Sequence, residues 1–137
     1  MTDFNKIILK PEEKLLKSMK VLQKYQCKIV LVCDLNLMLV GIISDGDIRR
    51  HLLAGGSLDD KISKAMNSKP FALDFKKNKE VNSKILKDNG ILCAPILNKK
   101  KRVVDFLYLD EIHEKKISNS VIIMAGGKGT RLLPLTK

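Results

Sequence analysis

Apolar residues recur along this chain with two spacings, and segments of the two kinds alternate. Residues 11–26 carry apolar side chains three or four positions apart, with lysines on the other face, which predicts an amphipathic helix with Pro11 in its first turn. Two apolar runs follow, at 28–34 (KIVLVCD) and 38–43 (MLVGII), and the short turn between them predicts a pair of strands. The stretch SDGDIRRHLLAGG at 44–56 begins with helix-start residues and ends in two glycines, which predicts a second helix.

The same order of elements recurs further along the chain. A helical link at 58–66 and a strand at 70–75 lead to the second copy, whose predicted elements are a helix at 78–89, strands at 91–97 and 103–109, and a short helix at 110–116. Ile112 follows Ile48 by 64 residues and occupies the matching place. Each copy alone is too small to cover its sheet, so the two must pack on each other. The pattern predicts an α/β (α+β) fold with repeats at 1–66 and 67–117.

Composition narrows the class of protein and of partner. The chain has 137 residues and is 45% hydrophobic, which is enough for a packed core and argues against disorder. Its net charge of +11 favours partners that carry phosphate groups. The charge is mostly lysine scattered along the chain, and only 4% of the residues are aromatic. Because nucleic-acid sites interleave basic clusters with stacking aromatics, we expect no nucleic-acid partner.

The cysteines and the terminal sequence bear on the compartment. Cys27, Cys33 and Cys93 lie in or beside apolar runs, without CxxC spacing or a nearby histidine set. This pattern predicts buried thiols, with neither disulfides nor a metal site, and suits the reducing cytoplasm. The first residues lack the apolar core of a signal peptide, and no apolar run reaches the length of a membrane span. We therefore expect a cytoplasmic protein without a membrane partner.

Three features together resemble a known regulatory family. The doubled unit, the segment GIISDGDI at 41–48 and the link AMNSKP at 65–70 resemble a tandem pair of CBS domains, or Bateman module, over roughly residues 5–116. The resemblance implies two pseudo-symmetric β-α-β-β-α repeats packed sheet to sheet. It also implies an adenine nucleotide (AMP, ADP or ATP) as ligand, and a homodimer formed through the pair.

Ser44 and Asp47 stand where a strand gives way to a helix. Helix amino termini present unpaired N–H groups and partial positive charge, which stabilise a phosphate, and Ser44 adds a hydroxyl. The Asp47 carboxylate could accept hydrogen bonds from both hydroxyls of a ribose. Ser-x-x-Asp is equally close to a capping box, which serves only the helix, and the two roles can coexist. Arg49 and Arg50 either reach the ligand's phosphates or form a solvated basic face, and neighbouring helical residues point in different directions.

The second copy departs from this pattern. With Ile112 aligned on Ile48, Tyr108 stands at the place of Ser44, Glu111 at that of Asp47, and Asp105 at that of Gly41. A tyrosine ring replaces a small hydroxyl. We therefore expect one competent nucleotide cleft, which contains Asp47, and a second cleft that is altered or empty.

The last stretch, residues 118–137, differs in kind from the repeats. A predicted strand, VIIMA, runs into a glycine-rich basic loop that fits neither the Walker A nor the Rossmann fingerprint. The string MAGGKGTRLLPLT instead resembles the amino-terminal signature of sugar-phosphate nucleotidylyltransferases. That resemblance implies a Mg²⁺-assisted reaction and a loop around the nucleoside triphosphate, formed by Gly126, Gly127, Lys128, Gly129, Thr130 and Arg131.

The rest of that signature, including its acidic metal ligands and sugar pocket, is not in the chain. We therefore expect no catalytic residue in this fragment, with residues 118–137 as a linker and the first strand and loop of a truncated transferase domain. Two functions follow as alternatives. The pair either binds an adenine nucleotide and modulates the attached transferase, or it binds no ligand and dimerises the same enzyme.

Overall fold

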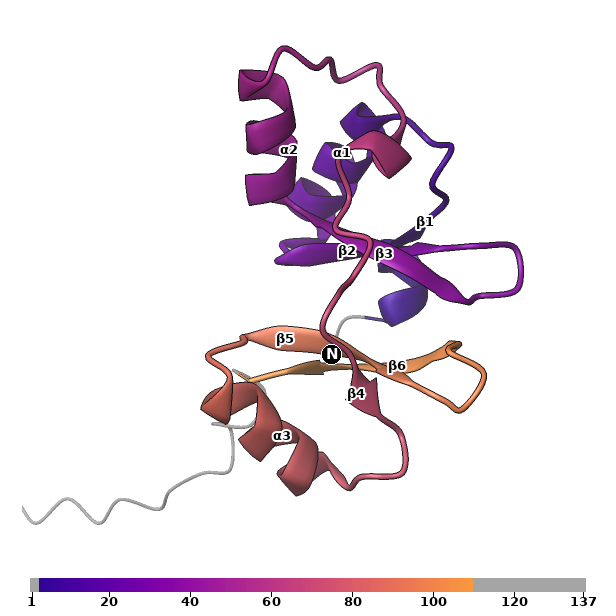
Figure 1. The fold of residues 1–137 in the computed structure, drawn as a ribbon, viewed down its shortest axis with the longest axis vertical. Helices are drawn as coiled ribbons and strands as arrows, with labels where there is room; N and C mark the ends of the chain where they lie inside the picture. Colours follow the sequence, from indigo (N-terminus) through magenta and orange to yellow (C-terminus); the bar gives the residue numbers. More distant parts are fainter. Residues whose placement is uncertain (1–2, 110–137) are drawn as a thin grey trace, which may run out of the picture.

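The computed structural model describes residues 3–109, which form two sheets stacked face to face with helices on their outer faces (Figure 1). Two short 3-10 turns, η1 (Phe4–Ile7) and η2 (Ile62–Lys64), precede the first strand of each repeat. The first repeat contains β1 (Ile8–Leu9), α1 (Leu15–Tyr25), β2 (Ile29–Cys33), β3 (Leu39–Ser44) and α2 (Asp45–Leu53). The described part of the second contains β4 (Leu73–Asp74), α3 (Lys79–Asp88), β5 (Cys93–Leu97) and β6 (Val103–Tyr108).

Each repeat builds one three-stranded mixed sheet, in the orders β1-β2-β3 and β4-β5-β6. The first pair of each sheet is parallel and the second is an antiparallel hairpin. Apolar residues of both sheets, among them Val30, Ile43, Cys93 and Val103, share one buried cluster. The predicted α/β fold of two β-α-β-β-α repeats packed sheet to sheet is confirmed for the described residues, and the helix predicted at 110–116 lies outside them.

Positions 64 residues apart have matching backbone conformations in the two repeats. Ile29 pairs with Ser44 in the first hairpin and Cys93 pairs with Tyr108 in the second, so both hairpins have the same register. Both carry an irregularity one pair before the turn. Left-handed φ angles also occur at matching positions of the two repeats. After the first helix of each repeat, Gln26 has a φ of 50° and Gly90 one of 64°. In the hairpin turns, Leu37 has a φ of 60° and Lys101 one of 57°. Three of these four residues have a Cβ, so the shared fold holds a conformation that local preference disfavours.

The two hairpin turns meet each other across a pseudo-twofold axis. Leu39 donates its N–H to the Lys101 carbonyl at 3.1 Å, and Val103 donates to the Leu37 carbonyl at 3.2 Å. These two bonds interchange when 64 is added to, or subtracted from, the residue numbers. They join the edges of the two sheets by backbone contacts, so the repeats are fixed to each other by more than the apolar interface.

Several predicted boundaries were wrong, and the inter-repeat segment at 58–67 explains two of them. The helix predicted from Pro11 begins at Leu15, and the Leu15 N–H, which a longer helix would use internally, bonds the Asp60 carbonyl at 2.9 Å. The helical link predicted at 58–66 contains only η2, because much of its backbone bonds the first repeat: Ile62 and Ser63 donate to carbonyls just before α1, and Asp60 accepts from its first residue. The strand predicted at 70–75 shortens to β4, the part that β5 pairs.

The inter-repeat segment fills a groove on the first repeat. Ile62 is fully buried, and its N–H bonds the Glu13 carbonyl at 2.8 Å. Further along, Asn67 and Ile42 exchange two backbone bonds at 2.8 and 3.1 Å, so the segment also pairs with the edge of β3. Gly41 permits this close approach, since a Cβ there would lie 2.8 Å from the Asn67 carbonyl oxygen.

Candidate functional site

Ser44 and Asp47 form a complete capping box at the start of α2. Asp47 donates its N–H to Ser44 Oγ at 3.3 Å, and Asp47 Oδ2 accepts from the Ser44 N–H at 2.8 Å and from the Ser44 hydroxyl at 2.6 Å. These bonds satisfy donors that every helix start leaves unpaired. The capping role weighed from the sequence is therefore present. It fixes both side chains where β3 ends and α2 begins.

The two arginines point to different carboxylates, as expected for neighbouring helical residues. Arg50 reaches back to Asp47, with Nη2 at 2.5 Å from Oδ1, whereas Arg49 pairs with Asp45 at 3.0 Å. The Asp47 side chain is only 15% exposed, but both arginine side chains are more than 70% exposed. Ser44, Asp47 and Arg50 thus form one cluster of a hydroxyl, a carboxylate and an exposed cation, whereas Arg49 lies outside it.

The helix start gives this cluster its electrostatic character. The N–H groups and dipole of α2 place partial positive charge there, and Arg50 adds a full charge. Gly46, in the first turn, has no side chain, and the nearest atom to a Cβ there would be Arg50 Nη1 at 3.4 Å. Chemically the cluster can accept hydroxyl hydrogens on Asp47 and hold an anion with Arg50 and the backbone.

The equivalent place in the second repeat holds an aromatic ring. Tyr108 closes β6 where Ser44 closes β3, and its hydroxyl accepts the Lys28 N–H of the first repeat at 2.7 Å. The ring packs edge-on against Phe106, with centroids 5.1 Å apart, and burial raises the pKa of the phenol to about 12. Tyr108 therefore spans the interface between the repeats. Glu111, the predicted counterpart of Asp47, lies outside the described residues.

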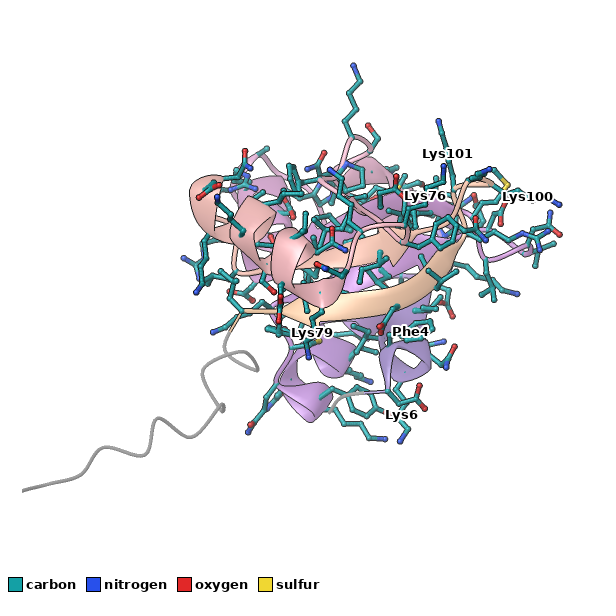
Figure 2. The ribbon with its side chains drawn as sticks, turned by 90° about the horizontal axis from the view of Figure 1, so that it is seen from below. Phe4, Lys6, Lys76, Lys79, Lys100 and Lys101 are labelled. Atoms are coloured by element: carbon teal, nitrogen blue, oxygen red, sulfur yellow. The ribbon has the colours of Figure 1, made fainter. Side chains whose placement is uncertain are left out.

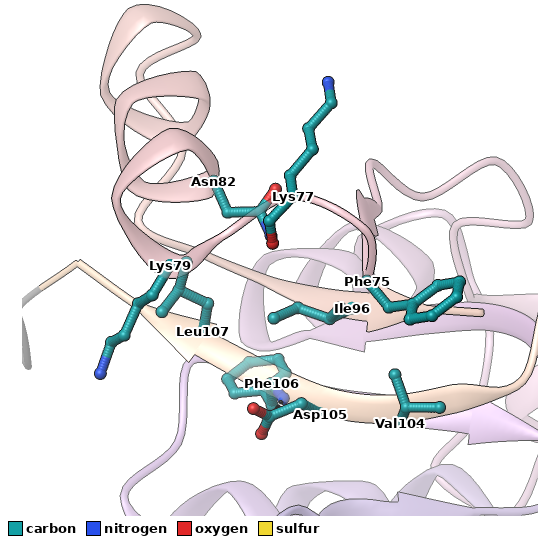
Figure 3. A pocket seen from close by; sticks show the side chains of 9 residues that line it. All are labelled: Phe75, Lys77, Lys79, Asn82, Ile96, Val104, Asp105, Phe106 and Leu107. Carbon is teal, nitrogen blue, oxygen red and sulfur yellow. Dashed lines mark hydrogen bonds between the residues drawn. The ribbon is translucent and has the colours of Figure 1, made fainter.

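Sequence reasoning missed a pocket on the outer side of the second sheet. A pocket of about 310 Å³ lies between the β4–α3 loop and strands β5 and β6, lined partly by Phe75, Lys77, Asn82 and Asp105 (Figure 3). Asn82 is 1% exposed and donates to the carbonyls of Asp74 and Lys77, both at 3.2 Å. Its Oδ1 is buried without a hydrogen-bond partner. An asparagine on the apolar face of a predicted helix was the one signal that could have indicated this place.

Other candidate chemistry is limited among residues 3–109. Cys27, Cys33 and Cys93 are buried and form no disulfide, and burial raises the pKa of the Cys33 thiol to about 11. This part of the chain holds no cluster of ligating side chains for a metal ion, and none of its helices has the length and apolarity to cross a membrane. Lys100 and Lys101 project together from the turn between β5 and β6, whereas Lys6 lies on the opposite side of the view (Figure 2). The glycine-rich loop, Gly126 to Arg131, lies outside the described residues.

Comparison with known sequences finds one family and one group of relatives. The model of the CBS domain family matches residues 1–54. Arabinose 5-phosphate isomerase GutQ of Salmonella typhi is 27% identical over 89 residues, which cover 65% of this chain and 28% of that protein. The same protein of Escherichia coli strain K12 gives the same identity and coverage. The chain therefore spans less than a third of the length of these relatives.

Solved structures of paired CBS domains match both repeats. The CBS domain pair of protein MJ0100, in complex with 5′-methylthioadenosine and S-adenosyl-L-methionine, has a TM-score of 0.65 at 19% identity. CBSX2 in complex with AMP has a TM-score of 0.65 at 18% identity. Each match covers 77% of this chain and 83% of the other. The chain therefore has the fold of a CBS domain pair, a Bateman module, whose first repeat matches the CBS domain family.

Proposed function

We propose that this CBS pair is a regulatory module that binds one adenine nucleotide, of the AMP, ADP or ATP type, in the cleft at Ser44 and Asp47. The observation that carries the proposal is the difference between equivalent positions, a small hydroxyl at Ser44 and a bridging ring at Tyr108. Two solved pairs of the same fold hold adenine-containing ligands. These facts support a single site in each chain.

The cluster suggests how each side chain would act. Arg50 now neutralises Asp47 Oδ1, so an incoming ribose would take that oxygen and release the guanidinium toward the phosphates. Ser44 and the first N–H groups of α2 would hold a phosphate oxygen. The carboxylate would keep its bond to the Ser44 N–H throughout. Arg49, paired with Asp45 and exposed, would contribute only long-range charge.

The attached enzyme is a further part of the proposal. The string MAGGKGTRLLPLT supports a sugar-phosphate nucleotidylyltransferase that begins within residues 118–137 and that the pair would modulate, with Mg²⁺ required by the whole enzyme. A coding sequence that stops after Lys137 would contradict this part alone. It would leave the nucleotide site untouched.

Thermal unfolding with AMP, ADP, ATP and S-adenosylmethionine tests the site. A ligand at 100 times its Kd should stabilise the chain by roughly 2.7 kcal/mol, seen as a rise in Tm over the ligand-free sample. In Asp47→Ala the ligand-induced rise should disappear. Because that change also removes a cap, each variant is compared with its own ligand-free sample.

Asp45→Ala is the matched control, since it removes a carboxylate of the same helical turn that pairs only with Arg49 among the described ion pairs. It should keep the full ligand-induced rise. If none of the four ligands raises Tm in the parent, or if Asp47→Ala responds as the parent does, the assignment of the cleft is wrong. If the chain is then found to be a dimer whose Tm no ligand changes, the alternative function, a dimerisation module that binds no ligand, is favoured.

A further inference from the structure

Two neighbouring arginines on α2 differ in the carboxylate that each one contacts. Arg49 pairs with Asp45, whose side chain is 68% exposed. Arg50 pairs with Asp47, whose side chain is 15% exposed. The two arginine side chains are exposed to the same extent, 72% and 73%. Both ion pairs therefore have an equally exposed cation, but only the second occupies a carboxylate that is mostly withdrawn from water.

The Asp47 carboxylate divides its two oxygens between the helix cap and Arg50. Oδ2 accepts from the N–H and the hydroxyl of Ser44 at 2.8 and 2.6 Å, and these bonds belong to the capping box. Oδ1 accepts only from Arg50 among the hydrogen bonds of residues 3–109. A ligand hydroxyl that binds Asp47 and leaves the cap intact must therefore use Oδ1, and it competes with Arg50 for that oxygen.

The guanidinium of Arg50 borders a small open space that also holds the Ser44 hydroxyl. A Cβ on Gly46 would lie 3.4 Å from Arg50 Nη1 and 3.7 Å from Ser44 Oγ, and glycine leaves this space unfilled. A phosphate group placed there can accept hydrogen bonds from both donors and carries the charge that a guanidinium requires. An uncharged group cannot replace the carboxylate as the ionic partner of Arg50.

We propose that Arg50 is a specificity-determining residue, which restricts the Asp47 cleft to adenine ligands that carry a 5′-phosphate. This inference rests on the proposed function, because it concerns the ligand of the same cleft. A nucleoside would separate Arg50 from Asp47 and leave the guanidinium without an ionic partner. A nucleotide would separate the same pair but supply its phosphate in exchange. The ion pair therefore opposes both ligands, and only a phosphate offsets its loss.

An arginine that only bound phosphate would behave differently. Its removal would weaken the binding of AMP and leave the binding of adenosine unchanged. Removal of an arginine that also occupies Asp47 should instead strengthen the binding of adenosine, because Oδ1 no longer has a competing partner. The direction of the change for adenosine therefore separates the two roles.

Isothermal titration with AMP and with adenosine tests the inference in the parent chain, Arg50→Gln and Arg49→Gln. Arg50→Gln should bind adenosine about fivefold more tightly than the parent does, which is the upper end of what an exposed ion pair contributes. The ratio of AMP affinity to adenosine affinity should fall about tenfold, because the phosphate no longer meets a guanidinium. Arg49→Gln removes an equally exposed charge from the same turn of α2 and should leave that ratio unchanged.

The outcomes separate this inference from the proposed function. If the parent binds AMP but Arg50→Gln binds adenosine no more tightly than the parent does, the role given to Arg50 is wrong and the nucleotide site stands. An equal change in Arg49→Gln would also overturn that role, because it would show a general effect of charge. If the parent and Arg50→Gln bind neither ligand, the proposed function is wrong and this inference is wrong with it.

Ionic strength gives a second readout in the unmodified chain. Salt weakens an ion pair with an exposed cation, and from about 0.01 to about 0.15 M NaCl the Debye length falls from about 30 to about 8 Å. Over this range the parent should bind adenosine more tightly as the Arg50–Asp47 pair weakens, and AMP less tightly as its phosphate is screened. In Arg50→Gln the binding of adenosine should not depend on salt. A parent whose adenosine affinity is independent of salt would show that Arg50 does not compete for Asp47.

Discussion

Removing the Tyr108 hydroxyl should weaken the contact between the two repeats. The hydroxyl accepts the Lys28 N–H at 2.7 Å across the interface, and Tyr108→Phe deletes this bond while leaving the ring. A typical intramolecular hydrogen bond contributes about 1 kcal/mol to stability. Lys28 is exposed, so water can replace the lost partner and the cost should not exceed that value. For a chain of this length the change corresponds to a fall in Tm of about 3–5 °C.

Tyr108→Ser extends the perturbation to the ring. Truncating a fully buried phenylalanine to alanine costs about 3–5 kcal/mol, and Tyr108 is half-buried, so the loss should be about 2 kcal/mol beyond that of the hydroxyl. Urea unfolding followed by circular dichroism measures both variants. Tyr25→Phe, at the end of α1, controls for the general effect of losing a phenol. If Tyr108→Phe unfolds at the parent's midpoint, the hydroxyl does not hold the repeats together.

The phenol's pKa gives an independent check on the same contact. Burial raises the pKa of Tyr108 to about 12, above its ordinary value of 10. The neutral phenol is therefore favoured in the folded state, and the stability linked to it is complete below pH 10 and is lost as the pH rises toward 12. The ultraviolet titration of the folded parent should include a late phase that Tyr108→Phe removes. A parent without the late phase would contradict the buried environment.

Two further changes probe the inter-repeat segment. Gly41→Ala should destabilise the chain by about 1–3 kcal/mol, because the new Cβ would lie 2.8 Å from the Asn67 carbonyl oxygen. Gly46→Ala is the control and should be tolerated, because its new Cβ would approach the long side chain of Arg50. The midpoints of urea unfolding of the two variants and the parent test this difference. Hydrogen bonds from Lys64, Ser57 and His51 hold the pKa of Asp60 well below its ordinary 3.8, so its contribution is present above that pH and is lost as the pH falls below it. Asp60→Asn should therefore lower Tm at neutral pH and flatten the acid side of the Tm profile, and a parallel profile would show that Asp60 is not the group responsible.

The period of 64 residues could be predicted because the local pattern of apolar and polar residues repeats with it. Each helix has an apolar face and each hairpin has two apolar runs around a polar turn, and these signals survive without tertiary context. Aligning Ile112 on Ile48 also placed Tyr108 opposite Ser44 correctly, as the two hairpin registers confirm. The capping box was equally local, since three residues separate its partners.

The features that could not be predicted depend on contacts between distant residues. The strands β1 and β4 have two residues each, too few for a periodic signal, and exist because a parallel neighbour pairs with them. The bond from Lys28 to Tyr108 joins residues 80 positions apart. The start of α1 was set by residues 58–60, which no helix propensity in residues 11–26 could reveal. The contact of Arg50 with Asp47 depends on one of several conformations available to the arginine side chain.

The duplication separates what the backbone decides from what side chains decide. The repeats share register, turn and left-handed positions, and they meet symmetrically at the hairpin turns. They differ at a few side chains: the ring of Tyr108 bridges the repeats where Ser44 does not, and Asn82 replaces the backbone donor that Ile62 supplies on the first repeat. A ligand entering at Ser44 would therefore act on one side of an interface whose other side Tyr108 already holds. Because the turn contact lies at the opposite end of both hairpins from Ser44 and Tyr108, we expect ligand-induced movement to be a rotation about the turns and not a separation of the sheets.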